Sequence, residues 1–344
     1  LMSETHFYNR SIWKGVMYFD VDLDPKENIK RFKGINLMTN LRNLSLFGVL
    51  FGFVVVALGA WTRLVDAGLG CPDWPGCYGF VVFPTSELDV AIAEQRFPQF
   101  PYDINKAIPE VVHRYFAATL GLVAIALSFL SFKQSEDINI RYWCLGLLVF
   151  ICCQGVFGYL TVSLKLLPII VTGHLFGGFI TVSLFFFIFI RAGNFPILNT
   201  FNIQKVKYIA LTCLVLLLVQ IFLGAWTSTN YASLACPDFP TCQGSFSPEM
   251  DFKNGFSFDQ EVGPNYLYGL LDNPSRVAIH YSHRVTALIL TFAYLVLISR
   301  LWFTAAAPLA SSVGVILLTQ ISLGIMNVVY VLPLYIAIAH NLVA

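Results

Sequence analysis

The chain has 344 residues, of which 57% are hydrophobic and only 12% are charged. This composition excludes an ordinary soluble globular domain and indicates an integral membrane protein. The formal net charge of +1 also argues against a nucleic-acid partner.

Seven apolar stretches are about long enough to cross a bilayer, because a membrane-spanning helix needs about 20 apolar residues. In chain order they are Leu44–Thr62, Val111–Phe132, Tyr142–Leu164, Pro168–Ile190, Tyr208–Ser228, Val277–Ser299 and Ala305–Tyr330. An eighth stretch, Leu332–Ala344, is too short as it stands, and we expect its helix to be truncated at the end of this chain. The sequence therefore predicts an all-α membrane protein with eight transmembrane helices.

The distribution of basic residues predicts the orientation in the membrane. Lysines and arginines are concentrated in the N-terminal tail and in the short loops, which the positive-inside rule assigns to the cytoplasm. The two long loops, about 66–109 and 229–275, then lie on the outer side of a bacterial inner membrane, in the periplasm. The tail lacks the apolar core of a signal peptide, so we expect the first span to act as an uncleaved signal.

A sequence pattern that occurs twice divides the chain into two halves. The segment LGAWTRLVDAGLGCPDWPGC (Leu58–Cys77) returns 165 residues later as LGAWTSTNYASLACPDFPTC (Leu223–Cys242). Four helices per half is an even number, so the halves insert in the same orientation and form a parallel repeat of two four-helix bundles. The predicted organisation is a cytoplasmic tail (1–43), a first half (44–190), a cytoplasmic linker (191–207) and a second half (208–344).

Histidines occupy matching places in the two halves. They are His113 in EVVHR, His283 in HYSHR, and His174 and His340 shortly after a Leu-Pro pair. A single buried histidine is often only a polar residue bonded to a neighbouring helix, but four at repeat-related positions favour ligation, because buried ionisable groups in a bilayer are usually functional. Two histidines from facing helices are suited to the axial positions of haem iron. We therefore expect two bis-histidine sites, His113/His174 and His283/His340.

The long loops each contain a C-x5-C pair, Cys71/Cys77 and Cys236/Cys242. An oxidising compartment favours a disulfide in each loop. A redox-active dithiol and unpaired thiols are the alternatives, and a zinc site is disfavoured because neither loop contains a histidine.

The two halves differ next to the first histidine. Glu110 precedes His113 by one helical turn, whereas His280 stands at the matching position of the second half. A carboxylate at this spacing lies on the same helix face as the histidine and can reach a haem edge or a bound water. Its alternative role is a helix N-terminal carboxylate favoured by the dipole. His280 is also a rival of His283 as ligand, although the repeat favours His283.

Three arginines lie near the outer interface, Arg63, Arg114 and Arg284. Arginine binds carboxylates in a bidentate manner, so these side chains are candidates for haem propionates. The alternative is that they only extend toward the membrane surface.

The combined motifs over residues 44–344 resemble the haem A synthase family, and the paired loop cysteines resemble its prokaryotic branch. The resemblance implies oxidation of the C8 methyl group of haem O to a formyl group by two successive monooxygenations with O2. It implies that His283 and His340 hold a prosthetic haem b, that His113 and His174 receive haem O, and that Glu110 is the essential carboxylate. It also implies a handover of haem O from haem O synthase, an unidentified electron donor and a possible homo-oligomer.

If both His113 and His174 bind the substrate iron, no axial position is left for oxygen. We therefore expect that one of the two detaches during turnover, or that the doubly ligated state is a resting or product complex. Two other functions fit the histidines, a dihaem electron-transfer cytochrome and a haem transporter or chaperone. The Glu110/His280 difference between the halves argues against a plain electron carrier.

Overall fold

The computed structural model describes residues 25–135, 137–193 and 206–344, with side chains from residue 39 onward. Within these ranges the chain is helical and forms no strand. The helices are α1 (Pro25–Leu64), α2 (Glu87–Arg96), α3 (Ile104–Gln134), α4 (Ile138–Ser163), α5 (Pro168–Ala192), α6 (Lys207–Thr229), α7 (Phe252–Gly255), α8 (Asn273–Trp302), α9 (Ala307–Val329) and α10 (Leu334–Val343).

Seven of the described helices are long and apolar enough to cross a membrane: α1 from Thr39 onward, α3, α4, α5, α6, α8 and α9. Each coincides with one of the seven predicted spans, so the prediction of a multi-pass membrane protein is confirmed. The eighth predicted span corresponds to the short apolar helix α10. Helix α1 begins at Pro25, earlier than expected, and therefore includes part of the predicted tail. Residues 1–24 of that tail and 194–205 of the predicted linker lie outside the described residues.

Side-chain caps and a proline set the N-terminal ends of α3, α5 and α8, three of the helices that carry the candidate histidines. Asp103 caps α3 by accepting a hydrogen bond from the backbone of Asn105, and Asp272 caps α8 by accepting one from Ser275. Pro168 is the first residue of α5, a position at which a backbone N–H would have no acceptor within the helix. The N-terminal ends of these helices are therefore fixed by local sequence.

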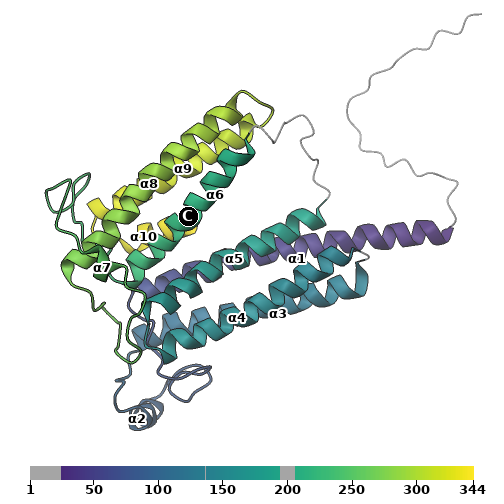
Figure 1. Ribbon diagram of the computed structural model, residues 1–344. Coiled ribbons are helices and arrows are strands. Elements are labelled where there is room, and N and C mark those ends of the chain that lie inside the picture. The colour runs from purple at the N-terminus through teal and green to yellow at the C-terminus, as the bar shows by residue number, and fades with distance from the viewer. Residues whose placement is uncertain (1–24, 136, 194–205) are drawn as a thin grey trace, which may run out of the picture.

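The spanning helices form two groups that diverge from the end at which the long loops lie (Figure 1). In the first group α1 packs against α3 and α5, and α4 packs against α3 and α5. In the second group α8 packs against α6 and α9, and α10 packs against α9. The groups contact each other through α5 against α6 and α1 against α10. The contacts between the groups thus pair the last helix of one with the first helix of the other.

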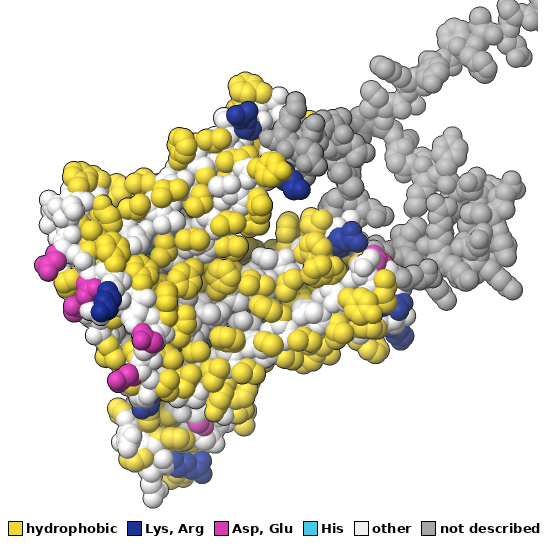
Figure 2. All heavy atoms as spheres, in the orientation of Figure 1, with side chains coloured by type: hydrophobic (Ala, Val, Ile, Leu, Met, Phe, Trp, Pro, Cys, Tyr) yellow, Lys and Arg dark blue, Asp and Glu magenta, His cyan; other side chains and the backbone are white. Residues whose placement is uncertain are grey.

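The outer surfaces of the helices are apolar. Figure 2 shows hydrophobic side chains covering the helical body, with charged side chains gathered toward its ends. Leu288 and Phe292 on α8 are 71% and 70% exposed, and Leu318 on α9 is 67% exposed. Large apolar side chains at such exposure match a lipid solvent rather than water.

Candidate functional site

Each of the four candidate histidines lies against a glycine of a neighbouring helix. The pairs are His113 with Gly59, His174 with Gly158, His283 with Gly224, and His340 with Gly324. A Cβ atom added at Gly59 would lie 2.9 Å from Cε1 of His113, and at the other three glycines the corresponding distance is 3.1 to 3.5 Å. An added Cβ would therefore crowd the ring most strongly at Gly59 and to a lesser degree at Gly224 and Gly324, whereas at Gly158 it would be in ordinary van der Waals contact. The two halves share this arrangement.

The rings of His113 and His174 face each other across the first group of helices. Their centroids are 6.4 Å apart and their planes are nearly perpendicular, at 86°. A metal ion held by one nitrogen of each ring at about 2 Å would place the centroids roughly 6 Å apart. The spacing therefore fits two axial ligands on a single metal.

Three of the four candidate histidines have a ring nitrogen without a hydrogen-bond partner among the described residues. Nδ1 of His113, His174 and His340 is buried and forms no hydrogen bond with the described residues. Unpaired buried polar atoms are rare in folded proteins and call for a physical reason. No group of three or more His, Cys, Asp or Glu side chains with metal-site geometry occurs among the described residues, which disfavours a conventional zinc cage. A pair of histidines without a third protein ligand is suited to an iron held by a macrocycle.

We expect that Gly59→Ala displaces the His113 ring, because the new Cβ would lie 2.9 Å from it. The matched control is Gly155→Ala on α4, where nothing lies within 4 Å of the added Cβ. The measurement is the haem-to-protein ratio of each purified variant after loading with haem. A Gly59→Ala protein that binds haem like the Gly155→Ala protein would contradict the assignment of His113.

Both long loops are closed by disulfides, which confirms the prediction for the cysteine pairs. The bonds join Cys71 to Cys77 and Cys236 to Cys242. Inside the first loop, the Asp73 carboxylate accepts hydrogen bonds from the backbone N–H groups of Tyr78 at 2.6 Å and Gly79 at 2.8 Å. Burial raises the pKa of Tyr78 to about 12, and its phenol donates to the carbonyl of Pro101 at 3.1 Å. The loop is therefore held by its own internal contacts.

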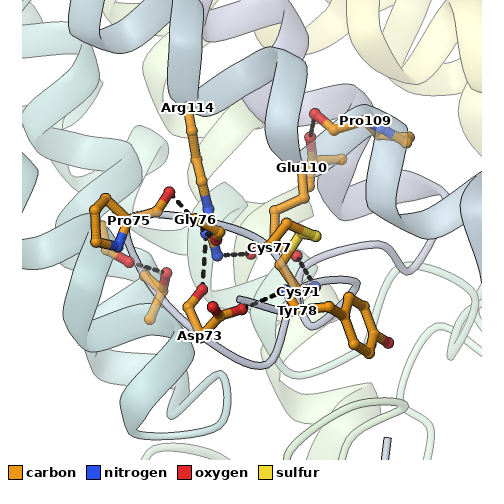
Figure 3. Close-up of polar contacts among 12 residues, drawn as sticks. Cys71, Asp73, Pro75, Gly76, Cys77, Tyr78, Pro109, Glu110 and Arg114 are labelled. Carbon is orange, nitrogen blue, oxygen red and sulfur yellow. Dashed lines mark hydrogen bonds and ion pairs between the residues drawn. A yellow bond between two sulfur atoms is a disulfide. The ribbon is translucent and has the colours of Figure 1, made fainter. Parts of the chain in front are cut away.

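The arginine that follows each first histidine binds the disulfide loop of its half. Arg114 donates to the carbonyl oxygens of Asp73 at 2.8 Å and Gly76 at 2.5 Å (Figure 3). Arg284 donates to three carbonyls of the second loop, at 2.8 to 2.9 Å. The sequence makes both arginines candidates for binding propionates. In the structure their guanidinium groups hold the loops over the N-terminal ends of α3 and α8.

Glu110 connects the first loop to the histidine-bearing helix. Its carboxylate accepts a hydrogen bond from the backbone N–H of Cys71 at 2.9 Å and pairs with Arg114 at 2.5 Å. The side chain is buried, with the residue only 4% exposed. The sequence predicts a carboxylate directed to a haem edge or a bound water, whereas its described partners lie in the disulfide loop and on its own helix. No local sequence pattern indicates the contact with Cys71.

His280 takes the place of Glu110 in the second half, and its Nδ1 is buried without a hydrogen-bond partner among the described residues. Its Nε2 accepts a hydrogen bond from Nε of Arg284 at 3.1 Å, and the residue is 5% exposed. His283, by contrast, lies against Gly224 and within hydrogen-bonding distance of Gln220. His280 therefore supports the arginine that binds the second loop, whereas His283 faces the neighbouring helix α6.

Arg63 lies at the contact between the two halves. Its guanidinium stacks over the ring of Tyr231 at 3.8 Å, donates to the carbonyl of Ser228 and pairs with Asp66 at 3.5 Å. The Tyr231 hydroxyl donates to Asp66 at 2.9 Å. The pairs Arg63–Ser228 and Asp66–Tyr231 are each separated by 165 residues, the offset of the sequence repeat. Residues at equivalent positions thus touch each other, as expected next to a two-fold axis.

Removing the first disulfide by Cys71→Ser together with Cys77→Ser should lower the free energy of unfolding by about 2 kcal/mol, because a short loop is no longer closed in the unfolded chain. Limited proteolysis of the loop and the thermal midpoint are the measurements. The control is Cys152→Ser, which changes an exposed free cysteine on α4. Equal midpoints for the double and the control variant would contradict a structural role of this bond.

The sequence is similar to those of known proteins. A family model described as cytochrome oxidase assembly protein (COX15-CtaA) matches residues 42–344. A protein of Shewanella oneidensis named heme A synthase is 40% identical over 295 residues, which cover 85% of this chain and 89% of that protein. Proteins of the same name from Neorickettsia sennetsu and Methylobacterium radiotolerans are 26% and 28% identical, over 86% and 84% of this chain and 92% and 82% of theirs.

Proposed function

Because this chain belongs to the COX15-CtaA family of cytochrome oxidase assembly proteins, we propose that it is a haem A synthase. The observation that carries the proposal within the structure is the set of four histidines, each seated against a glycine of the neighbouring helix. The reaction converts the C8 methyl group of haem O to a formyl group in two oxygenations. Each oxygenation takes one O2, two electrons and two protons and releases one water, and loss of a further water from the resulting geminal diol leaves the formyl group.

We propose that His113 and His174 receive haem O as substrate and that His283 and His340 hold a prosthetic haem b. The 6.4 Å spacing of the first ring pair supports axial ligation. When bound, the prosthetic haem would supply one-electron redox chemistry. The protein residues provide the ligands, the glycine-lined space and the exclusion of water.

Glu110, Arg114 and the disulfide loop act together in the proposed first pocket. The loop lies over the outer end of α3, and Glu110 and Arg114 fix it there through contacts of 2.5 to 2.9 Å. Exclusion of water protects a reactive site from side reactions. We propose that these contacts keep the outer mouth of the pocket closed and hold the first turns of α3, and with them His113, in register.

We propose that the molecule is built as two parallel repeats, 44–190 and 208–344, each of four helices, with α10 in the eighth position. The repeat offset between Arg63 and Ser228 and between Asp66 and Tyr231 supports this arrangement. The proposed location is the bacterial inner membrane, with the disulfide loops in the periplasm, where an oxidising environment maintains them. Haem O synthase is the proposed donor of the substrate, and a homo-oligomer and a separate electron donor are further expected partners.

The experiment that tests the function uses cells that make haem O but have no haem A synthase of their own. Membranes are prepared from these cells with and without this chain, and the extracted haems are separated by chromatography. The proposal predicts a formyl-bearing haem only where the chain is present. Haem O that is returned unchanged from membranes containing the folded protein would overturn the proposal and favour an electron carrier or a transporter.

A further inference from the structure

The two proposed haem pockets differ at one position beside their first histidine. Gln220 on α6 and Val55 on α1 occupy equivalent positions of the repeat, four residues before Gly224 and Gly59. The two glycines contact His283 and His113 in the same way. One pocket thus has an amide beside its histidine where the other has an apolar side chain.

Gln220 contacts the imidazole of His283 directly. Its Nε2 lies 3.0 Å from Nδ1 and 3.4 Å from Nε2 of His283, and 3.2 Å from the carbonyl oxygen of the same residue. Oε1 of Gln220 is buried and has no partner among the described residues. Of the four candidate ligands, His283 is the one whose Nδ1 has a side-chain hydrogen bond in the described part of the chain.

An amide suits both states of the ring. In the ring without iron, Nδ1 can accept a hydrogen bond from the amide nitrogen. Ligation through Nε2 leaves the remaining ring proton on Nδ1, and a half-turn of the amide then presents the unpartnered Oε1 as acceptor. A partner at this nitrogen fixes the ring orientation and raises the basicity of the ligand. The valine of the first half has no side-chain acceptor to offer.

We infer that Gln220 is a positioning residue that makes His283 a permanent iron ligand. At the equivalent position of the first half, Val55 gives the His113 ring no side-chain hydrogen bond, so His113 is an exchangeable ligand. The inference rests on the proposed function, because it assigns the resident haem to the second pocket. It gives a physical reason why two similar pockets hold their haems differently. A substrate haem must enter and leave its pocket, and one of its ligands has to give way to oxygen. A first-pocket histidine without a side-chain hydrogen bond can detach more easily.

The test uses the purified holoprotein and three variants, Gln220→Leu, Gln220→Glu and the matched control Gln154→Leu. Gln154 also precedes a histidine-contacting glycine, Gly158, by four residues, but its side chain lies against Gly177 of α5. Two properties of the resident haem are measured: its reduction potential and its rate of transfer to apomyoglobin.

We expect Gln220→Leu to release haem at least about tenfold faster than the unchanged protein and to have a higher potential, because a less basic imidazole stabilises ferric iron less well. Gln220→Glu should retain haem and have a lower potential, because a carboxylate is the stronger acceptor. Gln154→Leu should match the unchanged protein in both properties.

Equal potentials and release rates for the unchanged protein, Gln220→Leu and Gln220→Glu would overturn the inference. If Gln220→Leu does not insert into the membrane, the test rests on Gln220→Glu. A reduction potential of Gln220→Glu equal to that of the unchanged protein would then overturn the inference. Failure of the proposed function looks different, because the unchanged protein would then return haem O without a formyl group, whatever the potential and release rate of its resident haem.

Discussion

Replacing Glu110 by alanine is expected to lower the rate of formyl formation roughly 100-fold, because small displacements of groups that define a reaction site have effects of this size. The change removes the partner of the Cys71 N–H group and leaves Arg114 without its carboxylate. Breaking a buried ion pair by removing one member destabilises a protein by roughly 3 kcal/mol. The thermal midpoint should therefore fall together with the turnover.

The controls for Glu110 separate its position from its charge. Glu110→Gln keeps an oxygen that can accept from Cys71 but loses the ion pair with Arg114, so intermediate stability is expected. Glu87→Ala removes an exposed carboxylate of α2 and should change neither property. A Glu110→Ala protein with unchanged melting and turnover would show that the link between the loop and α3 has no role.

His283→Ala is expected to yield a protein without its resident haem, because one of the two proposed axial ligands is removed and the pocket offers no replacement beside Gly224. His280→Ala is the matched comparison, since it removes an imidazole one helical turn away. His280 accepts a hydrogen bond from Arg284, so its loss should loosen the second loop and leave haem binding intact.

The haem-to-protein ratio of the purified variants distinguishes these outcomes. The proposal predicts a ratio near zero for resident haem in His283→Ala and an unchanged ratio in His280→Ala. Loss of resident haem in His280→Ala but not in His283→Ala would identify His280, rather than His283, as the ligand.

Hydropathy was sufficient to predict the spanning helices, because a run of about 20 apolar residues is typical of a membrane span and rare in a soluble domain. The repeat then selected His113, His174, His283 and His340 from the six histidines of the chain. In the structure each of the four lies against a glycine, a pairing that hydropathy and the repeat alone do not predict. Composition and internal symmetry therefore predicted which elements exist, and the pairing of their side chains came from the structure.

The contacts of the first loop and the contact between Gln220 and His283 could not be predicted, because they join residues that are far apart in the chain. Glu110 and Cys71 are separated by 39 positions, and Gln220 and His283 by 63. One local signal was present but unused: Ser86 and Asp89 form a capping box that begins α2 inside the first long loop. The sequence makes Arg114 and Arg284 candidate binding residues. Their acceptors are backbone carbonyls of the loops, which no sequence pattern indicates.

The most direct measurement of the central claim is turnover by the purified protein in a lipid bilayer, supplied with haem O, a reductant and O2. The haems are extracted and identified by mass spectrometry. The account predicts that the C8 methyl group is converted to a formyl group by the unchanged protein and that His113→Ala and Glu110→Ala lose this activity. Haem O recovered unaltered from a protein that carries its resident haem would contradict the account.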